Sequence, residues 1–397
     1  MASVVRLILI FAAQGLWIAP LLCGQLREAV KIVGELHKLV LFSDGSVGGW
    51  GDMRDGQLGP KAAVPNRRGQ AKQFVPIAVP GKVIDIAAAE RTSYVLLEGG
   101  SVLAFGYGAD GELGCGDKVL QGSENPLTIA TLHNVKRIEA AGKTAFAIHN
   151  DGTISAWGSR DAGIIGDGKN PERWGESAGI AASPVRVPEV ANVSQLSTSG
   201  HHVLALTNDG KVLSWGSGGA QLGRTLTTAR HIGMPEEIPG LANVATVAAT
   251  SVASVALKKD GTVWVWGSNQ QAEFGNGQRQ DDQRSVVPLR VAGVQNVKAI
   301  TRGIIGRHIL VLLKDGTVRG WGNTDWGQVG NGVSGMEQAT PASAKITAVK
   351  AIFAGGNNSF AVKTDGSLWM WGYGDRGEWP LAANNKLPVI LELSPTR

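Results

Sequence analysis

Cysteine is nearly absent from this chain of 397 residues. Only Cys23 and Cys115 occur, and no internal disulfide can form if processing removes an N-terminal segment that carries Cys23. An exported chain of this kind must depend on its hydrophobic core, and a chain of this length can bury one. Cys115 lies between Gly114 and Gly116, a turn-like context that favours a small structural residue over a reactive thiol.

The sequence also lacks the short motifs of common enzyme and metal-binding classes. It contains no Gly-x-Ser-x-Gly elbow, no His-Glu-x-x-His helix, no Cys-x-x-Cys pair and no Asp-x-Asp-x-Asp-Gly calcium loop. The adjacent pair His201 and His202 is the nearest approach to a metal motif, and His202 occupies a position that recurs along the chain. We therefore predict no enzymatic activity, no catalytic residues, no bound metal ion and no cofactor.

Charge of one sign is not concentrated anywhere in the chain. Lys and Arg number 38 and Asp and Glu 33, a net charge of +5, and no basic run resembles a nucleic-acid-binding stripe. After residue 24 no apolar segment is long enough to span a bilayer. Nucleic acid is therefore not an expected partner, and contact with a membrane is expected only at the N-terminus.

The first 24 residues have the pattern of a targeting segment. Met1 and Arg6 precede an apolar stretch over 7–19, and a small residue, Gly24, precedes a polar sequence. This order is typical of a secretory signal, and the stretch is short for a spanning helix. We expect residues 1–24 to be a signal peptide and residues 25–397 to be one secreted or periplasmic domain. An uncleaved membrane anchor, a mis-assigned start codon and lipidation at Cys23 are alternatives.

Glycine is abundant, with 55 residues, and tryptophan is frequent, with 12. Seven Asp-Gly-like turns recur at steps of 50 to 58 residues, and an aromatic-Gly pair follows each turn at a constant distance. The turns are Asp44-Gly45, Gly99-Gly100, Asp151-Gly152, Asp209-Gly210, Asp260-Gly261, Asp315-Gly316 and Asp365-Gly366, and the aromatic residues are Trp50, Phe105, Trp157, Trp215, Trp266, Trp321 and Trp371. A fixed period of this length is the signature of a repeat architecture.

Each repeat predicts strands. Two apolar segments flank the turn and predict a β-hairpin, because Asp-Gly supplies the positive φ that a tight turn needs. Segments such as 203–206 and 310–313 are apolar on both faces, as expected for strands between neighbouring sheets. A Gly-rich loop and a segment that starts with proline complete the repeat. We predict an all-β, seven-bladed β-propeller with four antiparallel strands per blade.

Ring closure is expected at the C-terminus. The first repeat begins near Val30 with no proline-started strand before it, and the chain ends with such a strand, 387–393. If each proline-started strand pairs with the repeat that follows it, the C-terminal strand joins the first repeat and removes the open edges. No polar capping repeats occur, which argues against an open solenoid.

These repeats resemble those of the regulator-of-chromosome-condensation family. The best local matches are 260–267, with the sequence Asp-Gly-Thr-Val-Trp-Val-Trp-Gly, and 55–59, with the sequence Asp-Gly-Gln-Leu-Gly. The resemblance covers about residues 29–393 and implies a seven-bladed propeller. The family usually carries a histidine eight residues before the turn glycine, where it is expected to hydrogen-bond neighbouring backbone. That column here contains His37, Thr92, Thr144, His202, Ala253, His308 and Asn358, so the chain is a divergent member.

The resemblance implies two functions. The namesake of the family is a nucleotide-exchange factor for a small GTPase, but none of its exchange residues can be placed on this sequence. Secreted bacterial propellers with similar repeats include β-lactamase inhibitors, which bind through one loop-lined face. We expect a monomeric, exported bacterial scaffold that binds a protein partner, as an inhibitor or adaptor. An exchange factor-like regulator of a small GTPase is the alternative, and an enzyme with clustered carboxylates at the propeller axis is a third hypothesis.

Residues that break the repeat are the candidate partner contacts, because residues repeated in every blade serve the architecture. Tryptophan and arginine in loops are typical anchors of interfaces. We expect the loops after three of the aromatic-Gly strands to lie near one rim and to contribute Arg173, Trp174, Asp325, Trp326, Arg376 and Trp379. The alternative for Trp174 is a loop that folds back on its own blade.

Overall fold

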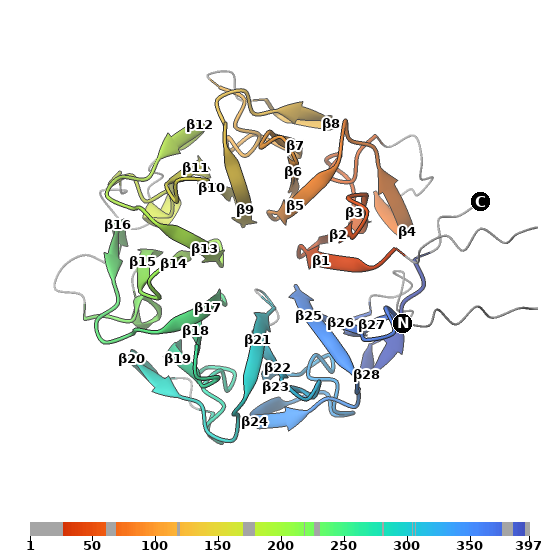
Figure 1. Ribbon diagram of the computed structural model, residues 1–397, viewed down its shortest axis with the longest axis vertical. Helices are drawn as coiled ribbons and strands as arrows, with labels where there is room; N and C mark the ends of the chain where they lie inside the picture. Colours follow the sequence, from red (N-terminus) through yellow and green to blue (C-terminus); the bar gives the residue numbers. More distant parts are fainter. Residues whose placement is uncertain are drawn as a thin grey trace, which may run out of the picture.

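A computed structural model describes residues 27–60, 69–116, 120–169, 179–217, 219–225, 231–279, 282–303, 305, 307–374 and 384–393. Within these ranges, 28 strands form seven four-stranded antiparallel sheets. Figure 1 shows the sheets as blades around a central axis. The seven-bladed propeller predicted from the repeat is confirmed. No helix in the described ranges is long and apolar enough to cross a membrane.

The blades follow the chain in order. The first four blades are β1 (Ala29–Val33), β2 (His37–Phe42), β3 (Val47–Asp52), β4 (Gln70–Ile77); β5 (Val83–Ala88), β6 (Thr92–Leu97), β7 (Val102–Tyr107), β8 (Gly122–Thr128); β9 (Val135–Ala141), β10 (Thr144–His149), β11 (Ile154–Ser159), β12 (Ile180–Arg186); and β13 (Val193–Thr198), β14 (His202–Thr207), β15 (Val212–Ser217), β16 (His231–Glu237). The last three are β17 (Val244–Ala249), β18 (Ala253–Lys258), β19 (Val263–Ser268), β20 (Arg284–Arg290); β21 (Val297–Arg302), β22 (His308–Leu313), β23 (Val318–Asn323), β24 (Glu337–Ser343); and β25 (Val349–Gly355), β26 (Asn358–Lys363), β27 (Leu368–Gly372), β28 (Asn385–Ile390).

The first strand of each blade lies at the axis and the fourth at the perimeter (Figure 1). The Asp-Gly turn joins the second and third strands, as predicted. In the first blade Gly45 has a φ of 83°, and the Asp44 carboxylate accepts a hydrogen bond from the Ser46 amide at 2.9 Å. The aspartate side chain thus stabilises the turn by binding the backbone N–H group two residues later, which is the usual role of this residue at a turn.

The strands in the middle of each blade are buried on both faces. Every residue of β2 and β22 is buried, because a neighbouring blade covers each side of the sheet. The fourth strands are partly exposed, and each carries one proline, which an edge strand tolerates because one side of it has no hydrogen-bonded partner. The hydrophobic core is therefore a ring of clusters between blades, and the axis itself is not filled by it.

In the third to seventh blades the repeated tryptophan links its blade to the blade before it. Trp157 and Trp215 are fully buried, and their indole N–H groups donate to the carbonyl oxygens of Glu112 and Ile164 at 2.8 Å. The glycine that follows is required by geometry. Gly158 has a φ of 104°, and a Cβ at this position would lie 2.2 Å from the carbonyl oxygen of Lys143.

The expectation that the C-terminal strand joins the first repeat is wrong. β28 pairs with β27 in its own sheet, and each fourth strand likewise pairs with the third strand that precedes it. The loop after the third strand returns the chain directly beside that strand, and pairing with so near a segment costs less loop-closure entropy than pairing across the ring. The fourth strand is therefore the outer edge of its own blade.

Side-chain packing, not a shared sheet, closes the ring between the first and seventh blades. Trp50 meets Phe360 edge to face at 6.0 Å between ring centroids, and the Lys350 ammonium lies 2.7 Å from the Glu28 carboxylate. A Cβ on Gly355 would lie 2.2 Å from the carbonyl oxygen of Gly34, so the two inner strands approach closely. The first and last strands in sequence, β1 and β28, thus belong to adjacent blades, as Figure 1 shows.

Candidate functional site

The ring has two unlike faces. The loop face carries the links between first and second strands and between third and fourth strands. Arg91, in a link of the first kind, binds Asp55, in a link of the second kind, at 2.7 Å. The turn face carries the Asp-Gly turns and the links between blades, which meet where the Val83 amide donates to the Gly45 carbonyl at 3.1 Å. The predicted loop that carries Asp325 and Trp326 links β23 to β24 and lies on the loop face.

Only two of the six predicted contact residues belong to the part of the chain that the structure describes. Asp325 and Trp326 lie in the link between β23 and β24. Arg173, Trp174, Arg376 and Trp379 lie outside the described residues, so their place on a common rim stays a prediction.

Trp326 is presented at the surface across the seam between the sixth and seventh blades. Its side chain is 36% exposed and packs edge to face on Tyr373, which follows β27, at 5.1 Å between ring centroids. The Trp326 amide donates to Oε1 of the buried Gln328 at 2.9 Å, which orients the loop. The Asp325 carboxylate is engaged within its own loop, because Oδ2 accepts a hydrogen bond from the side-chain amide of Asn323 at 2.8 Å. Trp326 is therefore the better contact candidate of the two.

Other exposed apolar side chains belong to the loop of Trp326 and to the neighbouring strand β28. Met336 and Val333, in the same loop, are 60% and 39% exposed, and Leu387 of β28 is 43% exposed. The loop is tied to β28, since the Gly332 amide donates to the Lys386 carbonyl at 2.9 Å. We call Trp326, Val333, Met336, Tyr373 and Leu387 the seam patch. Single exposed apolar residues are ordinary, but a group that spans two blades is typical of a contact surface.

Little in the sequence indicates this patch. Val333 and Met336 follow Gly332 and Gly335 in a polar loop, and no repeat position marks them. Leu387 belongs to a repeated outer strand, where the sequence alone does not separate an exposed side chain from a packed one. Two ammonium groups accompany the patch, on Lys345 and Lys386, and neither forms an ion pair with a described residue.

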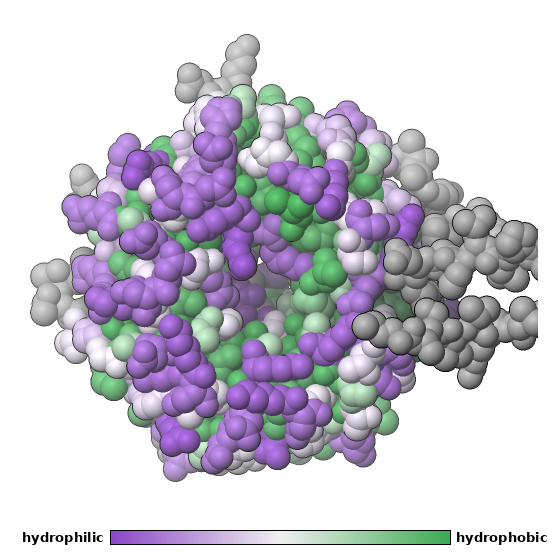
Figure 2. Space-filling view, in the orientation of Figure 1, coloured by the Kyte–Doolittle hydropathy of each residue, from purple (hydrophilic) through white to green (hydrophobic). Residues whose placement is uncertain are grey.

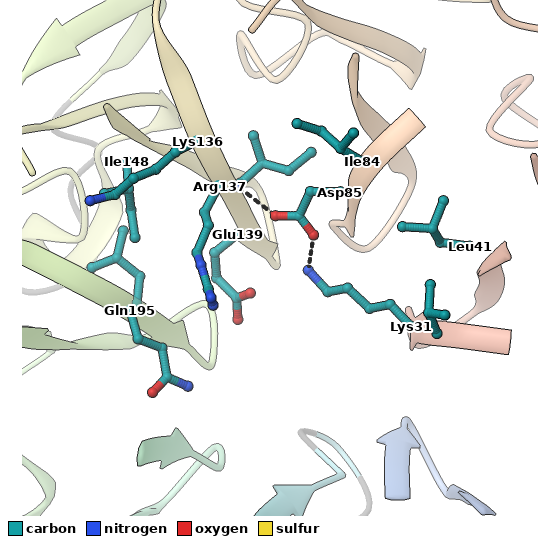
Figure 3. A pocket seen from close by; sticks show the side chains of 12 residues that line it. Lys31, Leu41, Ile84, Asp85, Lys136, Arg137, Glu139, Ile148 and Gln195 are labelled. Carbon is teal, nitrogen blue, oxygen red and sulfur yellow. Dashed lines mark hydrogen bonds and ion pairs between the residues drawn. The ribbon is translucent and has the colours of Figure 1, made fainter. Parts of the chain in front are cut away.

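The propeller axis is hollow and polar on one side. Figure 2 shows a depression at the centre of the ring, and Figure 3 shows the residues around one part of it. Two adjoining pockets, of about 440 and 310 Å3, follow the axis from the turn face to the loop face. The third residues of β1, β5, β9 and β13 are Lys31, Asp85, Arg137 and Gln195, whereas β21 and β25 carry alanine at this position.

Most of the charged groups at the axis bind one another or the backbone. Lys31 and Asp85 form an ion pair at 2.5 Å, and the other oxygen of Asp85 accepts from the Ile138 amide at 3.0 Å (Figure 3). The Arg302 guanidinium lies 3.5 Å from the Glu139 carboxylate and donates to the carbonyl oxygen of Ala249 at 2.8 Å. Burial raises the pKa of Glu139 and lowers that of Arg302.

The acidic groups at the axis mostly form contacts between blades. Within the described ranges, no group of three or more His, Cys, Asp or Glu side chains could hold a metal ion. Asp85 links its blade to both neighbouring blades, and Glu139 of the third blade faces Arg302 of the sixth blade across the axis, so these two carboxylates have structural partners.

The column histidines lie between blades. His37 and His202 donate from Nε2 to the hydroxyls of Ser93 and Ser254 in the next blade at 2.8 Å. Those hydroxyls donate in turn to main-chain carbonyls of the preceding blade, for example Ser93 to Gln57 at 2.6 Å. The expected contact with backbone is therefore made through a serine. Burial lowers the pKa of both histidines to about 3, so the rings are neutral.

The sequence contains a signal for this contact that the repeat pattern alone did not reveal. The residue after the column position is serine in three blades, and these are the blades that follow a column histidine. In chain order the residues are Lys38, Ser93, Ala145, Val203, Ser254, Ile309 and Ser359. The third pair, His308 and Ser359, is 2.9 Å apart. The matched histidines and serines therefore indicate, from sequence alone, that consecutive blades lie side by side.

Comparison with known proteins finds similarity to one family. A family model described as the RCC1-like domain matches residues 121–396. Protein pim1 of Schizosaccharomyces pombe is 29% identical over 332 residues, which cover 75% of this chain and 60% of that protein. Guanine nucleotide exchange factor SRM1 of Saccharomyces cerevisiae is 28% identical over 293 residues, which cover 68% of this chain and 60% of that protein. The chain thus spans about three fifths of the length of these relatives.

The architecture is also similar to that of solved structures. The crystal structure of Prp20p from Saccharomyces cerevisiae, reported with its binding properties to Gsp1p and histones, superposes with a TM-score of 0.73. The two sequences are 24% identical, and the match covers 92% of this chain and 87% of that one. This likeness concerns the fold alone and agrees with the seven blades of this chain.

Proposed function

The chain belongs to the RCC1-like domain family, and from this premise we propose that it is a protein-binding scaffold whose loop face engages a protein partner. The seam patch is the observation that carries the proposal. Trp326 is held across two blades by its contact with Tyr373 and still exposes 36% of its surface. Aromatic residues and methionine are enriched in the buried centres of protein interfaces.

The charges beside the patch define the kind of partner. Lys345 and Lys386 have no ion-pair partner among the described residues, so acidic side chains on the partner would complement them. The scaffold is closed and held by cross-blade hydrogen bonds. A pre-organised surface loses little conformational entropy on binding, which suits an inhibitor or adaptor.

The test is affinity capture with the full chain, followed by measurement of the dissociation constant for each captured protein. Met336→Ser and Trp326→Ala are expected to weaken binding at least tenfold, about 1.4 kcal/mol. Val287→Ser is the matched control, because Val287 is 62% exposed and Met336 is 60% exposed, but Val287 lies on β20 in the fifth blade. Equal affinities for all four proteins would place the partner site elsewhere.

Regulation of a small GTPase is a second candidate function. Its support is the similarity to SRM1, which is named a guanine nucleotide exchange factor, and to Prp20p, whose structure is reported with binding to Gsp1p. The measurement is release of a fluorescent GDP analogue from purified small GTPases, with and without the chain. Acceleration would favour this function, and binding of a partner without acceleration would favour the scaffold.

Export is part of the proposal for the N-terminal segment. Its support is the basic start, the short apolar stretch and the small residue at Gly24. Residues 1–26 lie outside the described residues, and pim1 and SRM1 come from yeasts, so they give no support to a bacterial source. N-terminal sequencing of the protein from its native cells tests cleavage near residue 24. A mature chain that starts at Met1 would contradict it.

A further inference from the structure

A small polar pocket lies on the loop face, at the boundary between the fourth and fifth blades. Its volume is about 210 Å3, and its walls come from the links between β15 and β16, between β17 and β18, and between β19 and β20. The polar side chains that line it belong to Gln221, Ser251, Ser268, Gln270 and Arg284. No carboxylate is among its described lining residues, which is a first indication of the charge that the pocket can receive.

The fifth blade departs from the repeat at this pocket. In the second blade Thr92, at the column position, donates to the main-chain carbonyl of Tyr107 at 2.6 Å. The corresponding residues of the fifth blade are Ala253 and Ser268, and alanine cannot make this bond. Arg284 pairs with Ser268 at a position that holds glutamine, glycine or isoleucine in the first three blades. Residues that differ from the repeat in this way are not required by the architecture.

The Ser268 hydroxyl is buried without a hydrogen-bond partner among the described residues. Ser268 is 8% exposed, and its Oγ neither donates to nor accepts from another described group. In the third blade the corresponding Ser159 accepts a hydrogen bond from the Asp161 amide at 3.1 Å, so a serine at this position can be satisfied within its own loop. Because a buried hydroxyl without a partner costs free energy, an unpaired Ser268 in the wall of a pocket points to a bound polar group.

The other polar groups of the pocket are left as donors. Arg307, in the link between β21 and β22, donates from Nε to the Ser251 hydroxyl oxygen at 3.1 Å and from Nη1 to Oε1 of Gln270 at 3.4 Å. These bonds occupy acceptor atoms, so the Ser251 hydroxyl hydrogen and the Gln270 Nε2–H groups remain for a ligand. Ser268 supplies a further hydroxyl hydrogen. A pocket that offers N–H and O–H groups fits a ligand that consists of acceptors.

The arginines at the pocket have no carboxylate partner in the part of the chain that the structure describes. Arg284 is exposed, and its guanidinium forms no hydrogen bond or ion pair with a described residue. Arg307 adds a second guanidinium, which is bound to uncharged side chains. Glu273 and Asp282 belong to the same link as Gln270 but do not line the pocket, and Glu273 is fully buried. Guanidinium groups beside free donors are typical of sites for carboxylate or phosphate.

We propose that this pocket binds an oxyanion, a carboxylate or phosphate group, between the Arg284 guanidinium and the hydroxyls of Ser251 and Ser268. A planar guanidinium donates two parallel hydrogen bonds to such a group, and the serine hydroxyls donate to the lone pairs that remain. A pocket of about 210 Å3 has room for the anionic group and a short carbon chain.

Two sources can supply the anionic group. One is free phosphate, and the other is an aspartate or glutamate side chain of a protein that covers the loop face. The pocket belongs to the fourth and fifth blades, whereas the seam patch belongs to the sixth and seventh. The inference therefore goes beyond the proposed scaffold function and is tested without any partner.

The experiment is a titration of the full chain with N-acetyl-glutamate amide and, separately, with inorganic phosphate, followed through the amide resonances of Ser251 and Ser268. N-acetyl-glutamine amide, the uncharged isostere, is the control ligand. We expect saturable shifts with the anions and none with the glutamine probe. Tighter binding of phosphate indicates free phosphate as the source, and tighter binding of the glutamate probe indicates an acidic side chain. Equal shifts with the glutamine probe, or no saturation with either anion, would overturn the proposal.

Arg284→Gln tests the ion pair. We expect it to reduce the affinity for the anion at least about tenfold, because a charge-assisted pair is lost. Arg290→Gln is the matched control, since Arg290 is an exposed arginine at the other end of the same strand, β20, and the variant should bind as the parent chain does. Unchanged affinity in Arg284→Gln, or an equal loss in both variants, would contradict the proposed ion pair.

Ser268→Ala separates loss of the site from loss of the fold. Because the hydroxyl has no partner among the described residues, we expect an unchanged melting temperature and an affinity about three- to tenfold lower. Ser159→Ala is the control at the corresponding position of the third blade. It breaks the bond with the Asp161 amide, so it should lower the melting temperature and bind the anion as the parent chain does. Parent-like affinity in Ser268→Ala would refute the role assigned to this hydroxyl.

The variant Trp326→Ala should bind both anions unchanged, because Trp326 lies at the seam patch and not at this pocket. Failure of the seam patch in capture experiments and failure of the oxyanion pocket are thus observed separately.

Discussion

His37 donates a hydrogen bond from Nε2 to the hydroxyl of Ser93 across the boundary between the first and second blades, at 2.8 Å. Ser93 in turn donates to the main-chain carbonyl of Gln57, so a chain of two hydrogen bonds begins and ends in the first blade and passes through the second. Both side chains are fully buried. The same relay joins the fourth blade to the fifth through His202 and Ser254. These relays connect sheets that share no strand.

Removal of the serine should destabilise the ring. Ser254→Ala leaves the Nε2–H of His202 buried without an acceptor, and we expect it to lower the free energy of unfolding by about 1–3 kcal/mol. Chemical denaturation measures the difference. Ser123→Ala is the control, because its hydroxyl lies on the exposed strand β8 and bonds only the nearby Asn125 carbonyl. Similar losses of unfolding free energy in the two variants would show that the relay contributes no more to stability than an exposed hydrogen bond does.

Acid should weaken the fold through the neutral histidines. Burial is the main cause that lowers the pKa of His37 and His202 to about 3, from an unfolded value of about 6.5. Between these values the unfolded state binds more protons, so stability falls as the pH decreases from about 6.5 towards 3. We expect His202→Gln to flatten this dependence in denaturation experiments at several pH values. An unchanged slope below about pH 6 would show that His202 does not carry the effect.

Glu112→Gln should stabilise the protein at alkaline pH only. Burial is the main cause that raises the pKa of Glu112 to about 7. Because the pKa is higher in the folded state, the folded protein keeps the proton up to a higher pH than the unfolded chain does. Stability is therefore lost as the pH rises from about 4.5 to 7. Glutamine cannot ionise, and it already occupies the corresponding loop position in three blades, as Gln57, Gln221 and Gln328.

We expect this variant to gain about 1–3 kcal/mol at about pH 8 and almost nothing at about pH 4. Denaturation at both pH values gives the comparison. Glu392→Gln, at an exposed position after β28, is the control. A gain for Glu112→Gln that is equal at both pH values would contradict the pKa argument.

Two glycines should respond in opposite ways to substitution. Gly158→Ala places a Cβ 2.2 Å from the Lys143 carbonyl at a φ of 104°, and we expect it to cost more than about 2 kcal/mol or to prevent folding. Gly99 stands where six other turns carry aspartate, and a Cβ there meets nothing within 4 Å. Gly99→Asp should therefore raise stability by about 0.5–1 kcal/mol. Melting temperatures of the two variants decide the matter, and a destabilised Gly99→Asp would contradict this interpretation of the turn.

The number and form of the blades followed from the sequence, because they depend on short-range patterns. A turn such as Asp44-Gly45, the strands beside it and the aromatic-Gly pair all lie within about 15 residues of one another. The prediction of ring closure failed because it concerned a pairing between segments far apart in the chain. The spacing of the proline-started strands does not indicate which neighbouring strand each of them pairs with. In the structure β28 pairs with β27.

The candidate site was less accessible to sequence reasoning. Trp326 was found because it breaks the repeat, but its neighbours in the seam patch come from two blades and gather only when these blades are side by side. The ion pairs at the axis were not found either, because each of them joins residues from different blades. Lys31 meets Asp85, and Arg302 lies beside Glu139, only where the inner strands gather around the axis.

The sequence by itself therefore determined the repeating unit, its hairpins and the sevenfold count, since local hydrogen bonds and side-chain periodicity specify each of them. Only the tertiary structure decided how the ring closes, which histidine meets which serine, and which charges at the axis have partners. Those properties depend on contacts between blades, and such contacts exist only after the whole ring has formed.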